Sequence, residues 1–205
     1  MIAFDHIAIS GETLQEAQAH VEDALGVALQ PGGAHDVFST HNALLGLEDG
    51  LYLEAIAINP AAPTPDRPRW FDLDRFAGPP RLTNWICCSP DMDAALRDLP
   101  KGFGVPVDLQ RDALRWRMAV PEDGVLPFDN VAPALIQWQS TPHPAKVLKP
   151  SGVRLKRLIV CHPDVKRLRK VLGAVLLDER VVFESGAAEL YAAFETPHGP
   201  RGISG

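Results

Sequence analysis

The stretch Phe4-Asp5-His6-Ile7-Ala8-Ile9, followed by Ser10-Gly11-Glu12-Thr13, decides how the fold is interpreted. Its first part alternates apolar residues with others, as a half-buried strand does. Its second part supplies helix-capping side chains, and residues 14–25 then place apolar side chains at helical spacing before Gly26. We therefore predict a strand that leads directly into a helix.

The same strand-to-helix pattern occurs twice more in the chain. The second copy covers residues 82–99 and enters its helix through Ser89-Pro90-Asp91, and the third covers 155–173 and enters through His162-Pro163-Asp164. Proline is tolerated in the first turn of a helix, where its missing N–H has no intrahelical partner to lose. Three entries of one kind indicate an internal repeat.

The segments after each helix repeat less regularly. Strand-like segments follow at 37–47 and 51–58, at 114–120 and 134–139, and at 181–184 and 190–195. Each unit is therefore interpreted as a βαβββ module, and the fold class as α+β. We expect one unit over 1–205, with module one at about 1–77, module two at about 80–140 and a shortened third module at about 151–197. Residues 199–205 are expected to form a frayed tail.

The amino-acid composition excludes several classes of function. The chain has 205 residues, of which 46% are hydrophobic and 22% charged, so it can bury an ordinary core. Its net charge of −6 argues against a nucleic-acid or anionic-membrane partner. Three cysteines are too few for a disulfide framework, and neither a signal peptide nor a long apolar segment is visible. We expect a cytoplasmic protein.

Several short segments resemble the vicinal-oxygen-chelate superfamily, and within it the glyoxalase-like domain family of bacterial proteins (the glyoxalase, bleomycin-resistance and dioxygenase fold). The residues that carry this resemblance are Phe4 to Ile9, Ser39-Thr40-His41-Asn42-Ala43-Leu44, Tyr52-Leu53-Glu54-Ala55-Ile56, Arg69-Trp70-Phe71-Asp72-Leu73-Asp74 and Ile136-Gln137-Trp138. The resemblance covers nearly the whole chain. It implies paired modules that form a cupped mixed sheet, with helices outside and a small-molecule site on the concave face. It does not imply one reaction.

The resemblance also implies a metal site. In superfamily enzymes the first strand of a module gives a His and the last strand a Glu, which correspond to His6 and Glu54 here. An imidazole and a carboxylate suit Zn, Mn, Fe or Ni, and the ion would polarise a carbonyl or activate water. In module two the equivalent positions hold Asn84 and Gln137, which are poor ligands for a transition metal. Two strong ligands are fewer than the three that catalytic zinc sites keep.

His41 is a candidate third ligand. If Asp49-Gly50 is a two-residue hairpin turn, Leu45 lies opposite Glu54, and the period of two then puts His41 on the same face as Glu54. A shift of one residue would turn His41 outward and bring Asn42 in. The turn signal favours the first register.

Two other readings of His6 and Glu54 remain open. In the first, the pair hydrogen-bonds across neighbouring strands and has only a structural role. In the second, it acts as a base without metal, because a carboxylate beside an imidazole fixes its tautomer and raises its basicity. The expected functions are therefore metal-dependent lyase, isomerase or dioxygenase chemistry on a small oxygenated molecule, or metal-free sequestration of a small molecule. A homodimer is a possible assembly.

Other side chains are assigned by strand alternation and by composition. Trp116 is a candidate pocket wall together with Asn42, Asn84 and Gln137, whereas Trp138 is expected on the opposite face. Superposing the three helix starts places Arg157 at the position equivalent to His6, where it could pair with a carboxylate. A run of arginines could meet an anionic substrate, but an exposed strand face is the preferred reading. That run comprises Arg111, Arg115 and Arg117.

Overall fold

The computed structural model describes all residues from Met1 to Gly205. Two βαβββ modules come first in the chain, and a third, differently paired unit follows. The first module contains β1 (Ala3–Ser10), α1 (Leu14–Leu25), β2 (Gln30–His35), β3 (Thr40–Gly46) and β4 (Tyr52–Ile58). The second contains β5 (Arg81–Cys88), α2 (Met92–Asp98), β6 (Val105–Arg111), β7 (Leu114–Val120) and β8 (Ala134–Trp138). The remaining elements are α3 (Pro144–Val147), β9 (Arg154–Cys161), α4 (Val165–Leu172), β10 (Val181–Glu184), β11 (Glu189–Thr196) and β12 (Gly199–Ser204).

The first helix begins and ends as its sequence predicts. Thr13 and Glu16 form a reciprocal capping box, and Gly26 ends the helix with φ 72°, a conformation that costs glycine little. Ala17, Val21 and Leu25 lie on its buried face. The helix therefore packs its apolar stripe on the sheet.

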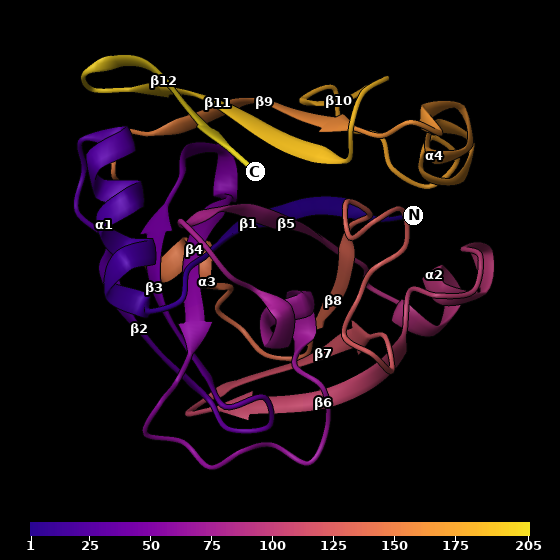
Figure 1. Cartoon of the computed structure of the whole chain (residues 1–205), viewed down its shortest axis with the longest axis horizontal. Helices are drawn as coiled ribbons and strands as arrows, with labels where there is room; N and C mark the ends of the chain where they lie inside the picture. The colour runs from indigo at the N-terminus through magenta and orange to yellow at the C-terminus, as the bar shows by residue number, and fades with distance from the viewer.

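The two modules share one curled sheet of eight strands in the order β2-β3-β4-β1-β5-β8-β7-β6. In each module the first strand pairs in parallel with the last, and β1 and β5 pair antiparallel at the centre. The sheet curls until its edge strands β2 and β6 lie close to each other, as Figure 1 shows. The predicted α+β class, with repeated modules and a cupped mixed sheet, is confirmed.

The third unit departs from this pattern. It forms a separate four-stranded sheet in the order β10-β9-β11-β12, in which β9 pairs in parallel with the first strand after its helix rather than the third. In Figure 1 this sheet lies over β1 and β5, on the side opposite the hollow of the larger sheet. Residues 199–204 form β12, so the predicted frayed tail is wrong.

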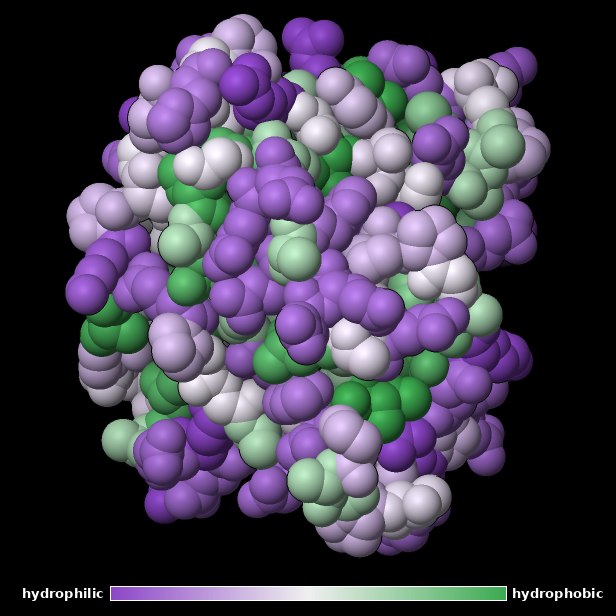
Figure 2. Space-filling view, turned by 60° about the vertical axis from the view of Figure 1, so that its left-hand side comes forward, coloured by the Kyte–Doolittle hydropathy of each residue, from purple (hydrophilic) through white to green (hydrophobic).

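One hydrophobic core joins the layers. The buried cluster contains Ile9 from β1, Leu135 from β8, Leu158 from β9 and Phe194 from β11. Hydrophilic side chains cover much of the face shown in Figure 2, and the apolar residues there form only small areas. None of the helices is both long enough and apolar enough to span a bilayer.

Candidate functional site

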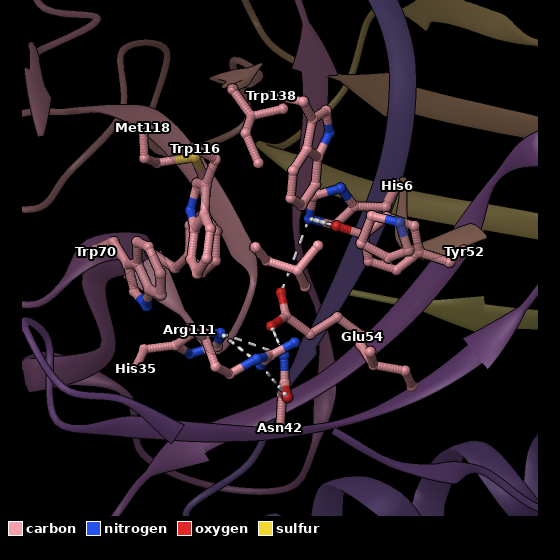
Figure 3. A pocket seen from close by; sticks show the side chains of 15 residues that line it. His6, His35, Asn42, Tyr52, Glu54, Trp70, Arg111, Trp116, Met118 and Trp138 are labelled. Atoms are coloured by element: carbon pink, nitrogen blue, oxygen red, sulfur yellow. Dashed lines mark hydrogen bonds and ion pairs between the residues drawn. The ribbon is translucent and has the colours of Figure 1, made fainter. Parts of the chain in front are cut away.

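A small pocket opens on the concave face of the eight-stranded sheet (Figure 3). It has about 40 Å³ of free space, enough for only a few water molecules, so a ligand must be small unless side chains move. Its polar residues are His6, His35, Asn42, Tyr52, Glu54 and Arg111. Its larger apolar residues are Trp70, Trp116, Met118, Ile136 and Trp138.

A β-bulge at the start of β1 places the side chain of Asp5 beside that of His6. Phe4 pairs with Cys87 and His6 with Ile86, so Asp5 is an extra residue in the strand. Bulges re-aim side chains, and here the Asp5 Oδ1 atom lies 2.7 Å from the His6 Nδ1 atom although the two residues are consecutive. Figure 3 shows the His6 ring beside Tyr52 in the pocket.

The Asp5 carboxylate is buried but well supplied with donors. Trp138 Nε1 and His143 Nε2 both lie 3.0 Å from its Oδ2 atom. Burial alone would raise the pKa of Asp5, but the hydrogen bonds from His143 and His6 and their charges hold that pKa well below its usual range. Asp5 is therefore a carboxylate at neutral pH.

This carboxylate fixes the tautomer of His6. The Nδ1–H group donates to Asp5, which leaves Nε2 as the ring nitrogen without hydrogen. The Nε2 atom lies 3.3 Å from the Tyr52 hydroxyl and 3.8 Å from Glu54 Oε2. His6 is thus an oriented base whose lone pair is directed at the polar part of the pocket.

Glu54 lies across the pocket floor from His6. Its Oε1 atom accepts a 2.6 Å hydrogen bond from Asn42 Nδ2. Burial raises the pKa of Glu54, and the nearby His6, the Asn42 hydrogen bond and the Arg111 charge oppose that rise without cancelling it. Glu54 can therefore hold a proton more readily than an exposed glutamate.

Burial also raises the pKa of Tyr52 well above its usual value, so Tyr52 is a neutral phenol.

The register of β3 decides which of two neighbouring residues enters the pocket. Leu44, not Leu45, pairs with Glu54, so the predicted register is wrong by one residue. The reason is the connection, because Gly46 pairs with Tyr52 and residues 47–51 form a longer loop with a short 3₁₀ turn. Asn42 consequently lies in the pocket. His41 lies outside it, beside residues of α1, so the register argument for His41 as a third ligand fails.

Three other predicted pocket residues also lie outside. Gln137 points away from the pocket and donates to the Pro90 carbonyl at 2.8 Å, because Ile136 and Trp138, its neighbours in β8, face inward. Asn84 is fully buried opposite Ala8 but does not line the pocket. Arg157 is exposed on β9, in the other sheet.

The pocket is completed by two residues from the edge strands, His35 of β2 and Arg111 of β6. Arg111 Nη1 lies 3.4 Å from His35 Nε2 and 3.3 Å from Asn42 Oδ1. Burial lowers the pKa of His35 to about 3, and the Arg111 charge is the next largest cause, so His35 is neutral. His35 Nδ1 lies 3.0 Å from the Thr40 hydroxyl, which leaves Nε2 as an acceptor for Arg111.

Tryptophans wall the pocket. Trp116 lies there, and its ring centroid is 5.9 Å from that of Trp138. The expectation that Trp138 lies on the outer face is wrong, since its indole N–H donates to Asp5. Trp70, which stacks on Phe38, forms another part of the wall. The interior is therefore aromatic on its sides and polar at its floor.

The donor atoms do not fit the metal shell that the resemblance implies. No group of three or more His, Cys, Asp or Glu side chains is arranged to hold a metal ion. His6 and Glu54 are two strong ligands, but the second module contributes Met118, Ile136 and Trp138 to this pocket. On the other side, the Asn42 N–H donor and the Arg111 cation are directed at the Glu54 end. A divalent ion would meet positive charge and an apolar wall where it needs ligands.

The family model described as a glyoxalase-like domain matches residues 4–176. The chain belongs to the glyoxalase-like domain family. The match covers the pocket and both modules of the larger sheet, and it ends before β10, so most of the four-stranded sheet lies outside it. The predicted membership is confirmed. No curated protein matches the sequence.

Solved structures are similar to this chain at low sequence identity. A hypothetical protein from Staphylococcus aureus is similar with a TM-score of 0.62 and 15% identity, over 92% of this chain and 87% of the other. Methylmalonyl-CoA epimerase from Mycobacterium tuberculosis gives a TM-score of 0.43 and 19% identity, over 70% and 91% of the chains. A Mn(II)-bound glyoxalase from Novosphingobium aromaticivorans gives 0.49 and 8%, over 98% and 81%.

Proposed function

We propose that this glyoxalase-like protein transfers a proton at a carbon atom next to a carbonyl group of a small molecule, with His6 as the base. The observation that carries the proposal is the orientation of His6. Its Nδ1 atom is held 2.7 Å from Asp5, and its Nε2 atom is 3.8 Å from Glu54 inside an aromatic pocket. An oriented imidazole of this kind can act as a general base.

The reaction needs no oxidant. His6 Nε2 takes the proton, and the electron pair of the broken C–H bond forms the double bond of an enolate, whose negative charge rests on the former carbonyl oxygen. A protonated Glu54, the Asn42 amide or the Tyr52 hydroxyl can donate a hydrogen bond to that oxygen. If His6 first exchanges its proton with solvent, return of a proton to the same carbon gives isotope exchange. Delivery of the proton to another carbon or to the other face gives an isomer.

Proton exchange in D₂O tests the proposal. The protein is incubated with butanone, 2-oxobutanamide or 2-oxobutanoate, and loss of the methylene proton signal at C3 is followed by NMR. We expect the wild-type protein to accelerate exchange of at least one compound. Since a positioned base contributes about 100-fold or more, the His6→Gln variant should lose most of that acceleration. Equal exchange rates with the two folded proteins would reject His6 as the base.

Binding without turnover is the second candidate. The observation that favours it is the enclosed wall formed by Trp70, Trp116 and Trp138, which suits an apolar or planar ligand. On this account a ligand stabilises the protein against heat, and no compound undergoes exchange. Stabilisation by a ligand that survives in His6→Gln, without exchange in either protein, would favour sequestration over catalysis.

A further inference from the structure

We infer that the small molecule bound in this pocket carries a carboxylate, and that Arg111 binds it. This inference rests on the proposed function, because it names the substrate class of the same site. It makes Arg111 a residue that determines specificity, placed on the opposite module from His6 and Glu54.

Arg111 lacks an anionic partner. Arg117, on the outer face of the neighbouring strand β7, is by contrast paired with Asp93 at 2.9 Å. Arg111 lies within ion-pair distance of no carboxylate, and its two hydrogen-bond partners are neutral groups at 3.3 and 3.4 Å. A guanidinium has five N–H donors in a planar fork that matches a carboxylate, so most of its capacity is unused.

The structure around Arg111 is shaped to hold this side chain. A Cβ atom added to Gly33 would lie 2.7 Å from the Cδ atom of Arg111, so glycine at this position makes room for it. His35 Nε2 and Asn42 Oδ1 accept from the same guanidinium nitrogen, which fixes its position at the seam between β2 and β6. A solvent-exposed arginine does not need contacts that hold its guanidinium in one position.

The Arg111 charge lies near the proposed base, His6. Asn42 accepts from Arg111 and donates to Glu54, and Glu54 lies beside His6 Nε2. Figure 3 shows Arg111 and His6 on opposite sides of Glu54. A short molecule with its carboxylate at Arg111 therefore places its neighbouring carbon atoms toward the base. Asp36 and Asp112 lie on the outer side of Arg111, along an open surface depression, and neither is within ion-pair distance of it.

Calorimetric titration with 2-oxobutanoate and 2-oxobutanamide tests the inference without any variant. The two compounds have nearly the same shape, and only the first is charged. Hydrogen bonds to a charged group contribute enough that we expect the acid to bind the wild-type protein about tenfold to a hundredfold more tightly. Equal affinities, or binding of neither compound, would overturn the inference.

Variants locate the interaction. Arg111→Gln should lose the preference for the acid, and Arg111→Lys should keep part of it, since lysine retains the charge but not the planar fork. Arg115→Gln is the matched control, because Arg115 is an exposed arginine on the neighbouring strand β7 and its loss should leave the preference intact. A preference that survives in Arg111→Gln, or that is lost equally in Arg115→Gln, would overturn the assignment.

The two proposals can fail separately. If the wild-type protein exchanges the amide as readily as the acid, the Arg111 inference is wrong and proton transfer by His6 stands. If the acid binds through Arg111 but neither compound exchanges, the carboxylate inference stands and the catalytic proposal is wrong.

Discussion

At the scale of single residues, Asp5 has the largest influence on the chemistry of the pocket. It is a buried carboxylate that contacts His6, Trp138 and His143, and it owes its ionised state to those contacts. It departs from the strand alternation, because a bulge places it beside His6. The orientation of His6 as a base therefore depends on the bulge as well as on the histidine itself.

Replacement of Asp5 by Asn should destabilise the protein in a pH-dependent manner. The folded-state pKa of Asp5 lies below its usual value of 3.8, so its ionisation stabilises the fold above about pH 4, and this contribution is lost as the pH falls further. We expect Asp5→Asn to lower the free energy of unfolding by about 1–3 kcal/mol at pH 7, with a smaller difference near pH 3. Urea titrations at several pH values measure it. Asp93→Asn, on the exposed surface, is the control and should change little. A variant at Asp5 as stable as the wild type at pH 7 would contradict this account.

Replacement of Glu54 by Gln should have the opposite effect on stability. Burial raises the folded-state pKa of Glu54 above 4.5, so the fold is favoured while this group is protonated, and that advantage disappears as the pH rises through the folded pKa. Gln keeps an acceptor for Asn42 and carries no charge. We expect Glu54→Gln to unfold at a higher temperature than the wild type at pH 8 and at the same temperature at pH 4. A lower unfolding temperature at pH 8 would show that the ionised Glu54 stabilises the fold.

Only part of this site can be predicted from the sequence. His6 and Glu54 were found through the family resemblance, and Tyr52 could have been found, because it stands two residues before Glu54 on the same strand face. Asp5 could not have been, since alternation places it opposite His6 and only the bulge reverses this. Arg111 was visible in a run of charges, but nothing in that run distinguished the pocket residue from its exposed neighbours.

At the scale of elements, the edge strand β2 is unusual for its composition. Its sequence contains Pro31, Gly32 and Gly33, which have low strand propensity and are tolerated at an edge. The absence of side chains here is what lets Asn42 and Arg111 approach the strand. For the same reason this strand was not predicted, and His35, which it carries into the pocket, was missed.

The two glycines should respond differently to substitution by Ala. A Cβ atom on Gly32 would lie 2.0 Å from Asn42 Oδ1 and 2.6 Å from the Asn42 backbone oxygen, so Gly32→Ala should cost about 1–3 kcal/mol of stability. A Cβ atom on Gly33 meets only the flexible Arg111 side chain. Gly33→Ala should cost less than about 1 kcal/mol and weaken binding of 2-oxobutanoate. Chemical denaturation and calorimetry measure the two effects, and equal stability losses would refute the distinction.

The β3–β4 hairpin provides a test of register. His41 lies on the outer face and Asn42 on the inner face because the connection is longer than a two-residue turn. His41→Ala should therefore leave proton exchange unchanged. Asn42→Ala should reduce it, since Glu54 and Arg111 both lose a hydrogen-bond partner. Exchange assays on the two variants check the register, and the reverse ranking would support the register expected from the turn signal.

At the scale of the whole molecule, the third unit covers the back of the pocket sheet. Strands β11 and β12 lie against β5, and α1 also contacts β12. This makes the central strands β1 and β5 buried on both faces, as the full burial of Ile7 and Trp85 shows. The four-stranded sheet therefore supports the two strands that position His6, although most of it lies outside the family match.

The buried side chain of Ile203 tests this supporting role. It is 2% exposed on β12, in a segment expected from sequence to be frayed. Ile203→Ala should lower the free energy of unfolding by about 2–4 kcal/mol, because it leaves a cavity between packed layers. Arg201→Ala, on the exposed side of the same strand, should change stability by less than about 0.5 kcal/mol. Similar small losses for both variants in urea titrations would indicate that the strand contributes little.

Repetition of one strand-to-helix pattern predicts the modules and the α+β class, and the family resemblance adds the cupped sheet. Repetition could not predict that the third copy pairs β9 with β10 and leaves the larger sheet, because strand order depends on contacts between segments distant in sequence. The edge strands β2 and β6 and the terminal strand β12 were also missed. Alternation of apolar and polar residues identifies central, well-buried strands better than edge strands, because an edge strand depends more on the partner strand with which it pairs.

The orientation of His6 is the central claim, and its tautomer tests it most directly. Long-range ¹H–¹⁵N correlation spectra of the protein at about pH 8, with His6 assigned through the His6→Gln variant, report which ring nitrogen carries hydrogen. We expect a protonated Nδ1 and a bare Nε2, as the 2.7 Å contact with Asp5 requires, and loss of this preference in Asp5→Asn. A proton on Nε2 in the neutral ring of the wild-type protein would contradict the account, since His6 would then present no base to the pocket.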